Sequence, residues 1–437
     1  MTAPDLPRLA ALAALACAAT AAIAQAPYQY DNKLPPSPDY IGEIRRGPDG
    51  QLRTVPAPAA EPAPAAAMPA TALGPGQKVI RVGDGDGLIS LAEAARLARD
   101  GDIVEIAPGS YRRQPVVWTQ KRLTIRGVGE RPGMVADGAS AEGKAIWVIR
   151  HGDFTVDNIE FRGARVADGN GAGIRFERGS LRLKRCAFFD NEMGLLAGNN
   201  ADSTLEISDS EFGQAPRHDG PLHHLLYVGA IGKFSLTGSR FSGGYRGHLV
   251  KSRARDNFVA YNLLVDGPAG KASYELEFPN GGIAYVIGNV IGQSAGTDNP
   301  TLVAYGAEGP RWPENALYLA HNTLINDLHH GNFVFAWADK LGPATEVWAI
   351  NNLLVGYGNL DPAPHGRFEG NPTVSRAALI ETGGVPLRLT TDSPLRGSVR
   401  TAGMAGARSL VPQAEFVFPV GSRPLQPPSR VSPGAFQ

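Results

Sequence analysis

Val286-Ile-Gly-Asn289-Val-Ile291 is one copy of a short phrase that the chain repeats. The phrase consists of an apolar residue, two variable residues, a small polar residue, one variable residue and a second apolar residue. Its other copies span residues 156–161, 183–188, 207–212, 236–241, 259–264, 319–324 and 349–354. The copies recur roughly every 23 to 33 residues, which is a period typical of solenoid proteins.

Each copy predicts a short strand that ends in a turn, because it is rich in β-branched or aromatic residues and is followed by Gly, Asp or Asn. Such strands can stack into a coil in which each strand pairs with the coils above and below. The small polar positions would then form a ladder at the turn, consisting of Asn158, Ser210, Ser239, Asn262, Asn289, Asn322 and Asn352. We expect this ladder to be structural, since such side chains can bond to neighbouring coils. A β-propeller is the alternative, but four-stranded blades need a longer period.

The segment from Lys78 to Gly129 fits the first coil. Strands are predicted over 78–82 and 102–106. Between them, Ser90-x-x-Glu93 is a capping box that predicts a short helix through Arg99. We expect this N-terminal capping helix to cover the open end of the apolar core.

The same region resembles the pectate-lyase-like right-handed parallel β-helix superfamily. Its first coils carry phrases similar to Gly101-Asp-Ile-Val-Glu-Ile-Ala-Pro-Gly-Ser-Tyr111 followed by Leu123-Thr-Ile-Arg-Gly127. The segments Asn371-Pro372 and Leu387-Arg-Leu-Thr-Thr-Asp-Ser-Pro394 resemble its last coils. The resemblance covers roughly residues 77 to 395 and implies an all-β, right-handed parallel β-helix. It implies no single activity, because the superfamily includes lyases, hydrolases, epimerases and non-catalytic proteins.

The N-terminus is predicted to be a signal peptide over residues 1–24. An apolar Ala/Leu run follows Arg8, and Ala22-Ile23-Ala24 has the small-x-small pattern that precedes a cleavage site. The alternative is a membrane anchor, but the run is short for a span. We therefore expect a periplasmic or secreted protein with no membrane span after cleavage.

Composition defines the remaining segments. Residues 25–76 are rich in Pro and Ala, which predicts a solvated linker. The β-helix domain is predicted over 77–410, and a Pro-rich C-terminal tail over 411–437 at the surface. Cys186 is the cysteine that stays after Cys17 is removed, so no intrachain disulfide is expected.

Charge excludes some partners. The chain has 42 Lys+Arg and 42 Asp+Glu, and therefore lacks the basic excess that binding to nucleic acid demands. We expect a monomer that recognises its partner locally. A cluster of Arg246, Lys251, Arg253 and Arg255 offers a local cationic site for an acidic polysaccharide.

A second strand in each repeat supplies the candidate site. The aligned segments are His224–Tyr227, His248–Lys251, Tyr274–Glu277, Leu302–Tyr305 and Val334–Trp337. Because side chains alternate along a strand, their last residues are expected to project together on the outer face: Tyr227, Lys251, Glu277, Tyr305 and Trp337. His224 and His248 fall on the other face, as core residues or as contributors to substrate binding. No metal site is predicted, since the paired histidines at 223–224 and 329–330 would point to opposite faces.

This row has the chemistry of β-elimination from a uronic acid. The reaction needs a base beside the carboxylate, a cation that stabilises the developing charge, and a donor for the leaving oxygen. Lys251 is the candidate base, and Tyr227 is the candidate acid, or the base if its own proton is shifted. Arg253 and Arg246 are expected to hold the carboxylate. Tyr305 and Trp337 are candidates for stacking on sugar rings. Alternatively, Lys251 and Glu277 form an exposed ion pair and the aromatic residues only pack.

The phrase from Lys251-Ser252 to Asn262 resembles the chondroitinase-B and alginate-lyase group, in which the base lysine lies in a Lys-Ser phrase. The resemblance implies calcium as a cofactor. However, Gly244 and Arg246 replace the acidic ligands expected before the lysine, and Glu277 replaces the expected arginine on the next coil.

Three functions therefore fit the sequence. The first is an exported lyase, or a related epimerase, that acts on a uronic-acid-containing polysaccharide. The second is a glycoside hydrolase with Glu275 and Glu277 as its carboxyl pair, since residues two apart on a strand share a face. The third is a non-catalytic β-helix that binds glycan or cell envelope through the same groove.

Overall fold

The computed structural model describes the strands Gly42–Arg46 and Leu52–Pro56 and the residues from 74 to 437, except 75, 218–219, 221, 269, 298, 361–362, 364, 383–384 and 427–429. The signal peptide predicted over 1–24 lies outside the described residues, as does most of the segment 25–76. Where that segment is described, it contains an antiparallel hairpin of β1 (Gly42–Arg46) and β2 (Leu52–Pro56), which the linker prediction did not include.

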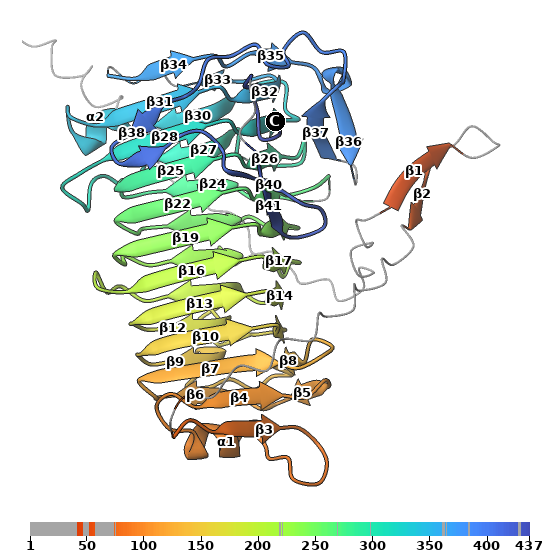
Figure 1. Cartoon of the computed structure of the whole chain (residues 1–437), viewed down its shortest axis with the longest axis vertical. Coiled ribbons are helices and arrows are strands. Elements are labelled where there is room, and N and C mark those ends of the chain that lie inside the picture. The colour runs from red at the N-terminus through yellow and green to blue at the C-terminus, as the bar shows by residue number, and fades with distance from the viewer. Residues whose placement is uncertain are drawn as a thin grey trace, which may run out of the picture. The chain divides into compact units, whose positions relative to one another are not determined.

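Most of the chain winds through three parallel sheets whose strands stack as successive rungs (Figure 1). The first sheet comprises β3 (Val79–Val82), β4 (Ile103–Ile106), β7 (Arg122–Gly127), β10 (Asp153–Asp157), β13 (Ser180–Lys184), β16 (Thr204–Ser208), β19 (Lys233–Thr237), β22 (Asp256–Ala260), β25 (Ile283–Ile287), β28 (Ala316–Ala320), β31 (Glu346–Ile350) and β34 (Arg367–Glu369). The second comprises β5 (Ser110–Arg112), β8 (Gly133–Val135), β11 (Glu160–Arg162), β14 (Ala187–Phe189), β17 (Glu211–Gly213), β20 (Arg240–Ser242), β23 (Leu263–Val265), β26 (Val290–Gln293), β29 (Thr323–Asn326), β32 (Leu353–Gly356) and β35 (Thr373–Val374).

The third sheet carries the candidate site. It comprises β6 (Val116–Trp118), β9 (Ala145–Ile149), β12 (Ala172–Phe176), β15 (Met193–Ala197), β18 (Leu226–Val228), β21 (Val250–Ser252), β24 (Leu276–Phe278), β27 (Thr301–Tyr305), β30 (Asn332–Ala336) and β33 (Asn359–Leu360). The predicted all-β parallel β-helix is thereby confirmed, and the β-propeller alternative is wrong.

Stacked apolar side chains fill the interior of the coil. Six aromatic rings continue one another through the lower rungs with centroid separations between 4.5 and 5.4 Å, in the order Trp118, Trp147, Phe161, Phe188, Phe212 and Phe241. Edge-to-face and offset contacts at these separations stabilise a core beyond simple burial of area. Since each ring comes from another rung, the stack couples the coils along the axis.

The predicted polar ladder is present. The backbone N–H and the side-chain amide of Asn262 both donate to Oδ1 of Asn289 at 2.9 Å, and the same pattern continues through Asn322 and Asn352. All four side chains are fully buried. They satisfy backbone groups at the turn that would otherwise be buried without partners.

Asn158 is the exception. Ile159 pairs with Cys186 at the ladder position, because the first copy has one residue fewer between its apolar residue and its polar residue. Asn158 instead has a φ of 56°, in the left-handed region, as do Arg185 (49°) and Asp209 (50°) on the next rungs. Asparagine tolerates this conformation, so Asn158 belongs to the turn and not to the ladder.

Helix α1 (Leu91–Leu97) lies beside the first rungs (Figure 1). Ser90 caps it by accepting a hydrogen bond from the N–H of Glu93 at 3.2 Å, as the capping box predicts. Leu91 and Ala94 are buried in the main core. The helix ends before the predicted Arg99, and its role as a cap stays a prediction.

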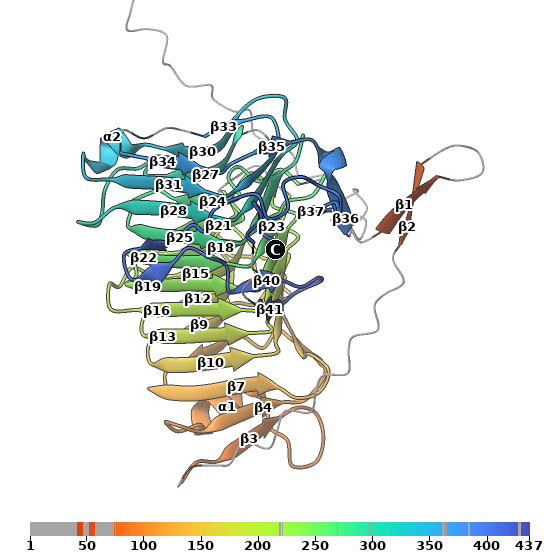
Figure 2. The same cartoon turned by 45° about the horizontal axis from the view of Figure 1, so that its top comes forward.

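The C-terminal segments pack along the coil (Figure 2). After β35 the chain forms three antiparallel hairpins, β36 (Leu379–Thr382) with β37 (Val385–Leu389), β38 (Met404–Ala405) with β39 (Arg408–Ser409), and β40 (Ala414–Phe416) with β41 (Ser422–Pro424). Phe416, Ala435 and Phe436 are buried against Leu263 and Val290 of the second sheet. The coil therefore ends well before residue 410, and the tail predicted over 411–437 is folded onto it.

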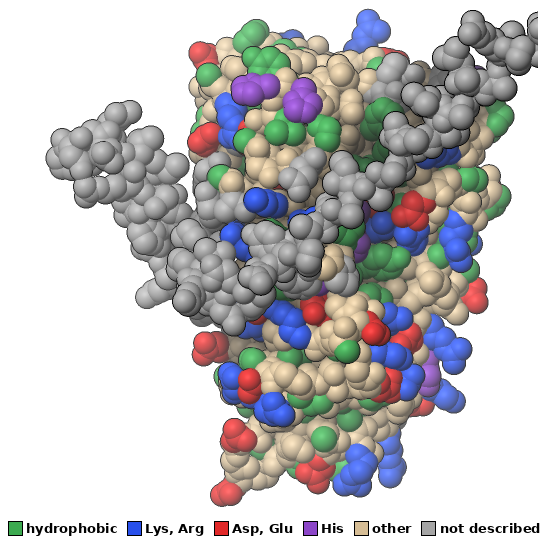
Figure 3. Space-filling model, turned by 180° about the vertical axis from the view of Figure 1, so that it is seen from behind, with side chains coloured by type: hydrophobic (Ala, Val, Ile, Leu, Met, Phe, Trp, Pro, Cys, Tyr) green, Lys and Arg blue, Asp and Glu red, His purple; other side chains and the backbone are tan. Residues whose placement is uncertain are grey.

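Charges of both signs lie on the face of the molecule seen from behind (Figure 3). Figure 3 shows Lys/Arg and Asp/Glu side chains interspersed over the lower part of the face seen from behind, in keeping with the formal net charge of +0. Among the described residues, no helix is long and apolar enough to cross a membrane.

Candidate functional site

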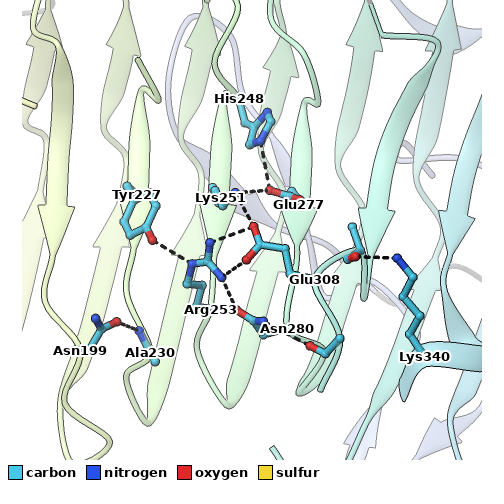
Figure 4. A network of polar contacts seen from close by, with 12 residues as sticks. Asn199, Tyr227, Ala230, His248, Lys251, Arg253, Glu277, Asn280, Glu308 and Lys340 are labelled. Carbon is cyan, nitrogen blue, oxygen red and sulfur yellow. Dashed lines mark hydrogen bonds and ion pairs between the residues drawn. The ribbon is translucent and has the colours of Figure 1, made fainter. Parts of the chain in front are cut away.

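Three of the predicted residues form a row on the outer face of the third sheet. Tyr227 of β18 pairs with Lys251 of β21, which pairs with Glu277 of β24. Figure 4 shows their side chains converging with Arg253, which follows β21. The row results from the parallel register, which places residues of consecutive rungs beside one another at about 4.8 Å.

The predicted row is out of register on the next two rungs, by one residue at Tyr305 and by two residues at Trp337. Glu277 is in register with Ala304, which is in register with Phe335. Tyr305 therefore faces the interior, is fully buried, and donates a hydrogen bond from its hydroxyl to the carbonyl of Gly282 at 2.6 Å. It cannot stack on a sugar.

Trp337 lies just beyond the end of β30 and precedes the short helix α2 (Ala338–Leu341). It is half-buried, and its ring meets that of Phe335 edge to face at 4.5 Å. Phe335, and not Trp337, is therefore the residue of β30 in register with the outer row. Sugar binding by Trp337 stays a prediction.

A cluster of four charges occupies the centre of the site (Figure 4). Nζ of Lys251 lies 3.0 Å from Oε2 of Glu277 and 3.2 Å from Oε1 of Glu308. Nη1 and Nη2 of Arg253 donate to the two carboxylate oxygens of Glu308 at 2.5 and 2.9 Å. The side chains of Lys251 and Glu277 are only 11% and 4% exposed, so the alternative of an exposed ion pair is wrong.

Arg253 also links this cluster to Tyr227. Its Nε donates to the phenol oxygen at 2.8 Å, and the guanidinium lies 5.8 Å from the ring centroid. A positive donor at a phenol oxygen stabilises negative charge on that oxygen. The contact thus places the phenol oxygen of Tyr227 beside a cation.

Both predicted histidines are buried beneath the row. Nδ1 of His224 accepts the backbone N–H of His248 at 2.9 Å, and Nδ1 of His248 accepts that of Tyr274 at 3.2 Å. The two imidazole rings are 4.5 Å apart. Both rings support the outer row from below; they are 6% and 5% exposed, close to the 8% of Lys251, so their contact with substrate stays a prediction.

His248 holds Glu277 in place. With Nδ1 acting as an acceptor, the proton of the neutral ring is on Nε2, which lies 3.1 Å from Oε2 of Glu277. Burial lowers the pKa of His248, although Glu277 partly offsets this, and burial lowers the pKa of His224 well below its usual value. Both rings are therefore neutral at neutral pH.

The outer carboxyls are ionised. Burial acts to raise the pKa of Glu277, but His248 and Lys251 outweigh it, so the pKa of Glu277 is lowered. The hydrogen bond from Arg253 lowers the pKa of Glu308. Burial acts to lower the pKa of Arg253, but Glu308 and Tyr227 raise it overall. The site thus holds two anions and two cations.

Glu275 lies in the interior and not beside Glu277. The chain bends at Glu275, which bonds through its backbone to Val250 and Leu302 and occupies a core position between leucines. The side chain is fully buried, and neither carboxyl oxygen has a hydrogen-bond partner among the described residues. Burial, followed by the charge of Asp266, raises its pKa well above the usual value. The predicted hydrolase pair of Glu275 and Glu277 is therefore wrong.

The residues do not fit the calcium site of the resemblance. Gly244 and Arg246 occupy the expected ligand positions, and nearby Asp266 uses its carboxylate to accept the N–H groups of Gly244 and Ala272 at 2.5 and 2.7 Å. In the described part of the chain, no group of three or more His, Cys, Asp or Glu side chains could hold a metal ion. Arg246 sits at a left-handed turn with a φ of 61°, and its contact with substrate stays a prediction.

Solved structures of other proteins are similar to this chain in fold. No family model matches the chain, and no curated protein matches its sequence. The solved structure of the pectate lyase Pel9A is similar, with a TM-score of 0.55 and 13% identity over 82% of this chain and 96% of that one. The chain has the pectate-lyase-like parallel β-helix fold.

Two further β-helix structures are similar over less of the chain. An alginate lyase from Paenibacillus sp. str. FPU-7 has a TM-score of 0.44 and 13% identity over 68% of this chain and 99% of that one. The tailspike protein gp49 of Acinetobacter baumannii bacteriophage Fri1, a capsular polysaccharide depolymerase, has a TM-score of 0.36 and 11% identity over 68% and 60%.

Three residues of the β-helix site were missed in the sequence. Asn280 accepts a hydrogen bond from Nη1 of Arg253 and donates to the carbonyl of Gly309 at 3.2 Å. Trp312 donates from Nε1 to the carbonyl of Arg253 at 3.0 Å. Glu308 completes the charge cluster. All three lie in connections of irregular length after β24 and β27, where the repeat gives no signal.

Proposed function

We propose that the protein is an exported polysaccharide lyase that cleaves a uronic-acid-containing glycan by β-elimination. The observation that carries this proposal is the hydrogen bond from Arg253 to the oxygen of Tyr227, directly beside Lys251 on the outer face. A base candidate, a proton donor and a guanidinium for a carboxylate thus lie within one rung of each other.

The elimination assigns a separate step to each group. Arg253 binds the uronate carboxylate, and its charge stabilises the enolate that develops when the neighbouring proton leaves. Tyr227 acts as the phenolate, whose charge the hydrogen bond from Arg253 stabilises, and it becomes a neutral phenol when it takes that proton. The electron pair of the broken C–H bond forms the new C=C bond, and the glycosidic C–O bond breaks. The ammonium of Lys251 protonates the departing oxygen.

Hydrolysis is less well supported by the same groups. A glycosidase pair needs one carboxylic acid that keeps its proton near neutral pH. The carboxyls of raised pKa among the described residues are Asp157, Asp209 and Glu275. Asp157 and Asp209 lie at the ends of strands of the first sheet, and Glu275 is inside the core. The outer carboxyls Glu277 and Glu308 both have a lowered pKa.

The test is an assay of the purified protein on alginate, chondroitin, pectin and bacterial exopolysaccharides, followed by the ultraviolet absorbance of the unsaturated product. We expect Lys251→Gln and Tyr227→Phe each to lower kcat/KM by about 100- to 10,000-fold, the range for loss of a general acid or base. The matched control is Lys233→Gln, an exposed lysine on the first sheet, which should keep full activity.

No unsaturated product from the folded protein on any of these polymers would contradict the lyase. Binding of a polymer without any product would instead support a non-catalytic glycan-binding protein.

A further inference from the structure

Glu308 occupies the place that the proposed reaction assigns to a substrate carboxylate. Both of its oxygens bond to the guanidinium fork of Arg253, at 2.5 and 2.9 Å, and one of them also lies 3.2 Å from Nζ of Lys251. Paired hydrogen bonds of this kind are how arginine recognises a free carboxylate. Figure 4 shows Glu308 reaching toward Arg253 and Lys251 from another connection of the coil.

We propose that Glu308 is an internal stand-in for the carboxylate of the substrate, and that an acidic sugar binds by displacing it from Arg253 and Lys251. The proposal rests on the proposed function, because it takes Arg253 as the group that receives a uronate.

The charges of the cluster require such an exchange. Lys251 and Arg253 carry two positive charges, and Glu277 and Glu308 carry two negative ones. With Glu308 in place, an incoming carboxylate meets a neutral cluster and an occupied guanidinium fork. When Glu308 leaves, the cluster has a net charge of +1 and the fork is open.

Glu308 is the anion that can leave. The side chain of Glu277 is 4% exposed and is held by both His248 and Lys251, whereas that of Glu308 is 43% exposed. Ion pairs near the surface are weakly held, since solvent compensates for much of the lost attraction. Removing Glu277 from its partners would instead strand charges in a buried setting.

The connection that carries Glu308 is held without help from its carboxylate. The backbone N–H of Glu308 donates to Pro279 at 2.8 Å, and that of Arg311 donates to Asn280 at 3.1 Å. Nζ of Lys340 donates to the carbonyl of Ala307 at 2.9 Å. A rotation of the Glu308 side chain can therefore vacate the fork while the backbone stays in place.

Exchange of this kind selects acidic sugars. A carboxylate can replace the two hydrogen bonds and the charge that Arg253 loses when Glu308 leaves. A hydroxyl or an ester of a neutral sugar supplies no charge, so it cannot compensate for the loss. Glu308 is thus a specificity-determining residue that lets the site reject neutral glycans.

The test uses acetate as the smallest carboxylate probe and acetamide as its uncharged counterpart, at constant ionic strength. Binding is followed by the nuclear magnetic resonance signal of the Arg253 Nε–H, which is assigned by its loss in Arg253→Lys. We expect Glu308→Gln to bind acetate at least about 10-fold more tightly than wild type, and neither protein to respond to acetamide.

The matched control is Asp327→Asn. Asp327 accepts three hydrogen bonds from Arg376 in another exposed pair, so this variant makes the same change in charge away from the site. It should bind acetate as wild type does. Equal acetate affinity in Glu308→Gln and wild type, with Glu308→Ala giving the same result, would overturn the exchange.

The two proposals fail separately. Tighter acetate binding by Glu308→Gln together with no cleavage of any polymer would contradict the lyase but support the exchange. Cleavage of a polymer by wild type with no gain in acetate affinity would support the lyase and overturn the exchange.

Discussion

Glu275 and Glu277 are two residues apart and both are buried, yet one lies in the interior of the coil and the other on its outer face. Glu275 stands among leucines with no hydrogen-bond partner among the described residues, and burial raises its pKa well above normal. Glu277 contacts His248 and Lys251, which outweigh burial and lower its pKa. Burial alone therefore does not decide the charge of a carboxyl, because the partners do.

The difference also separates what stabilises the coil from what serves the site. On the outer face, the buried charges of Lys251 and Glu277 are opposite and lie at hydrogen-bond distance. In the interior, Glu275 interrupts an apolar column that would be more stable with an aliphatic side chain. The two glutamates should therefore respond in opposite ways to the same substitution.

Replacing the outer glutamate should have the larger effect on stability. Glu277→Leu leaves Lys251 buried with only Glu308 as its anion and removes the acceptor of His248. We expect the free energy of unfolding to fall by about 3 kcal/mol, as when one partner of a buried ion pair is removed. Denaturant unfolding measures this free energy. An unchanged or higher unfolding midpoint would contradict the claim that Glu277 stabilises the outer face.

The same substitution in the interior should change the free energy of unfolding in the opposite direction. Glu275→Leu matches Leu249 and Leu302 on the adjoining rungs and removes a carboxyl that has no partner. We expect the free energy of unfolding to rise by about 2 kcal/mol, the cost of burying an unsatisfied polar group. Activity should stay within about twofold of wild type.

Glu275→Gln is the control for this variant, since it keeps the shape and the polar atoms and should give little of the gain. Loss of activity in Glu275→Leu would show that the interior carboxyl takes part in the reaction after all.

The smallest expected effect is a change in how stability depends on pH, which differs between the histidines beside the outer row and Glu275 in the interior. The pKa values of His224 and His248 are lowered, so below about pH 6.5 the unfolded chain takes up protons that the folded chain does not. Stability should therefore fall on acidification, by up to about 1.4 kcal/mol per pH unit for each such proton. The raised pKa of Glu275 acts in the other direction, because above its usual pKa the folded chain keeps a proton that the unfolded chain loses.

His248→Gln should flatten the acid side of the profile, as measured by unfolding midpoints across pH, and Glu275→Leu should flatten the neutral side. The control His330→Gln changes an exposed histidine and should alter neither slope. A slope in His248→Gln that equals that of wild type would contradict a contribution from His248.

The sequence predicts the coil well because the residues that repeat are those whose side chains face the core and the turn. The ladder from Ser210 to Asn352 follows directly from these positions. Two of the errors are shifts of one residue: Asn158 lies one position before the ladder, and Tyr305 lies one position after the residue in register with Glu277. Because side chains alternate between the two faces of a strand, a register shift of one residue moves a side chain from the outer face to the interior.

The site is predictable only where it lies on strands. Tyr227, Lys251 and Glu277 come from aligned rungs, and the parallel register brings them together. Glu308 and Asn280 come from connections whose length and path no local pattern describes. The chain bends at Glu275, just before β24, so alternation along the strand gave the wrong face for it.

The most direct test of the central claim is digestion of a responsive polysaccharide in water that carries a heavy oxygen isotope. β-Elimination breaks the glycosidic bond without adding water. The account predicts products with an unsaturated end, detected by ultraviolet absorbance, and no heavy oxygen at the newly formed reducing or non-reducing ends by mass spectrometry at early times. Incorporation of heavy oxygen during cleavage, with no unsaturated end, would contradict it.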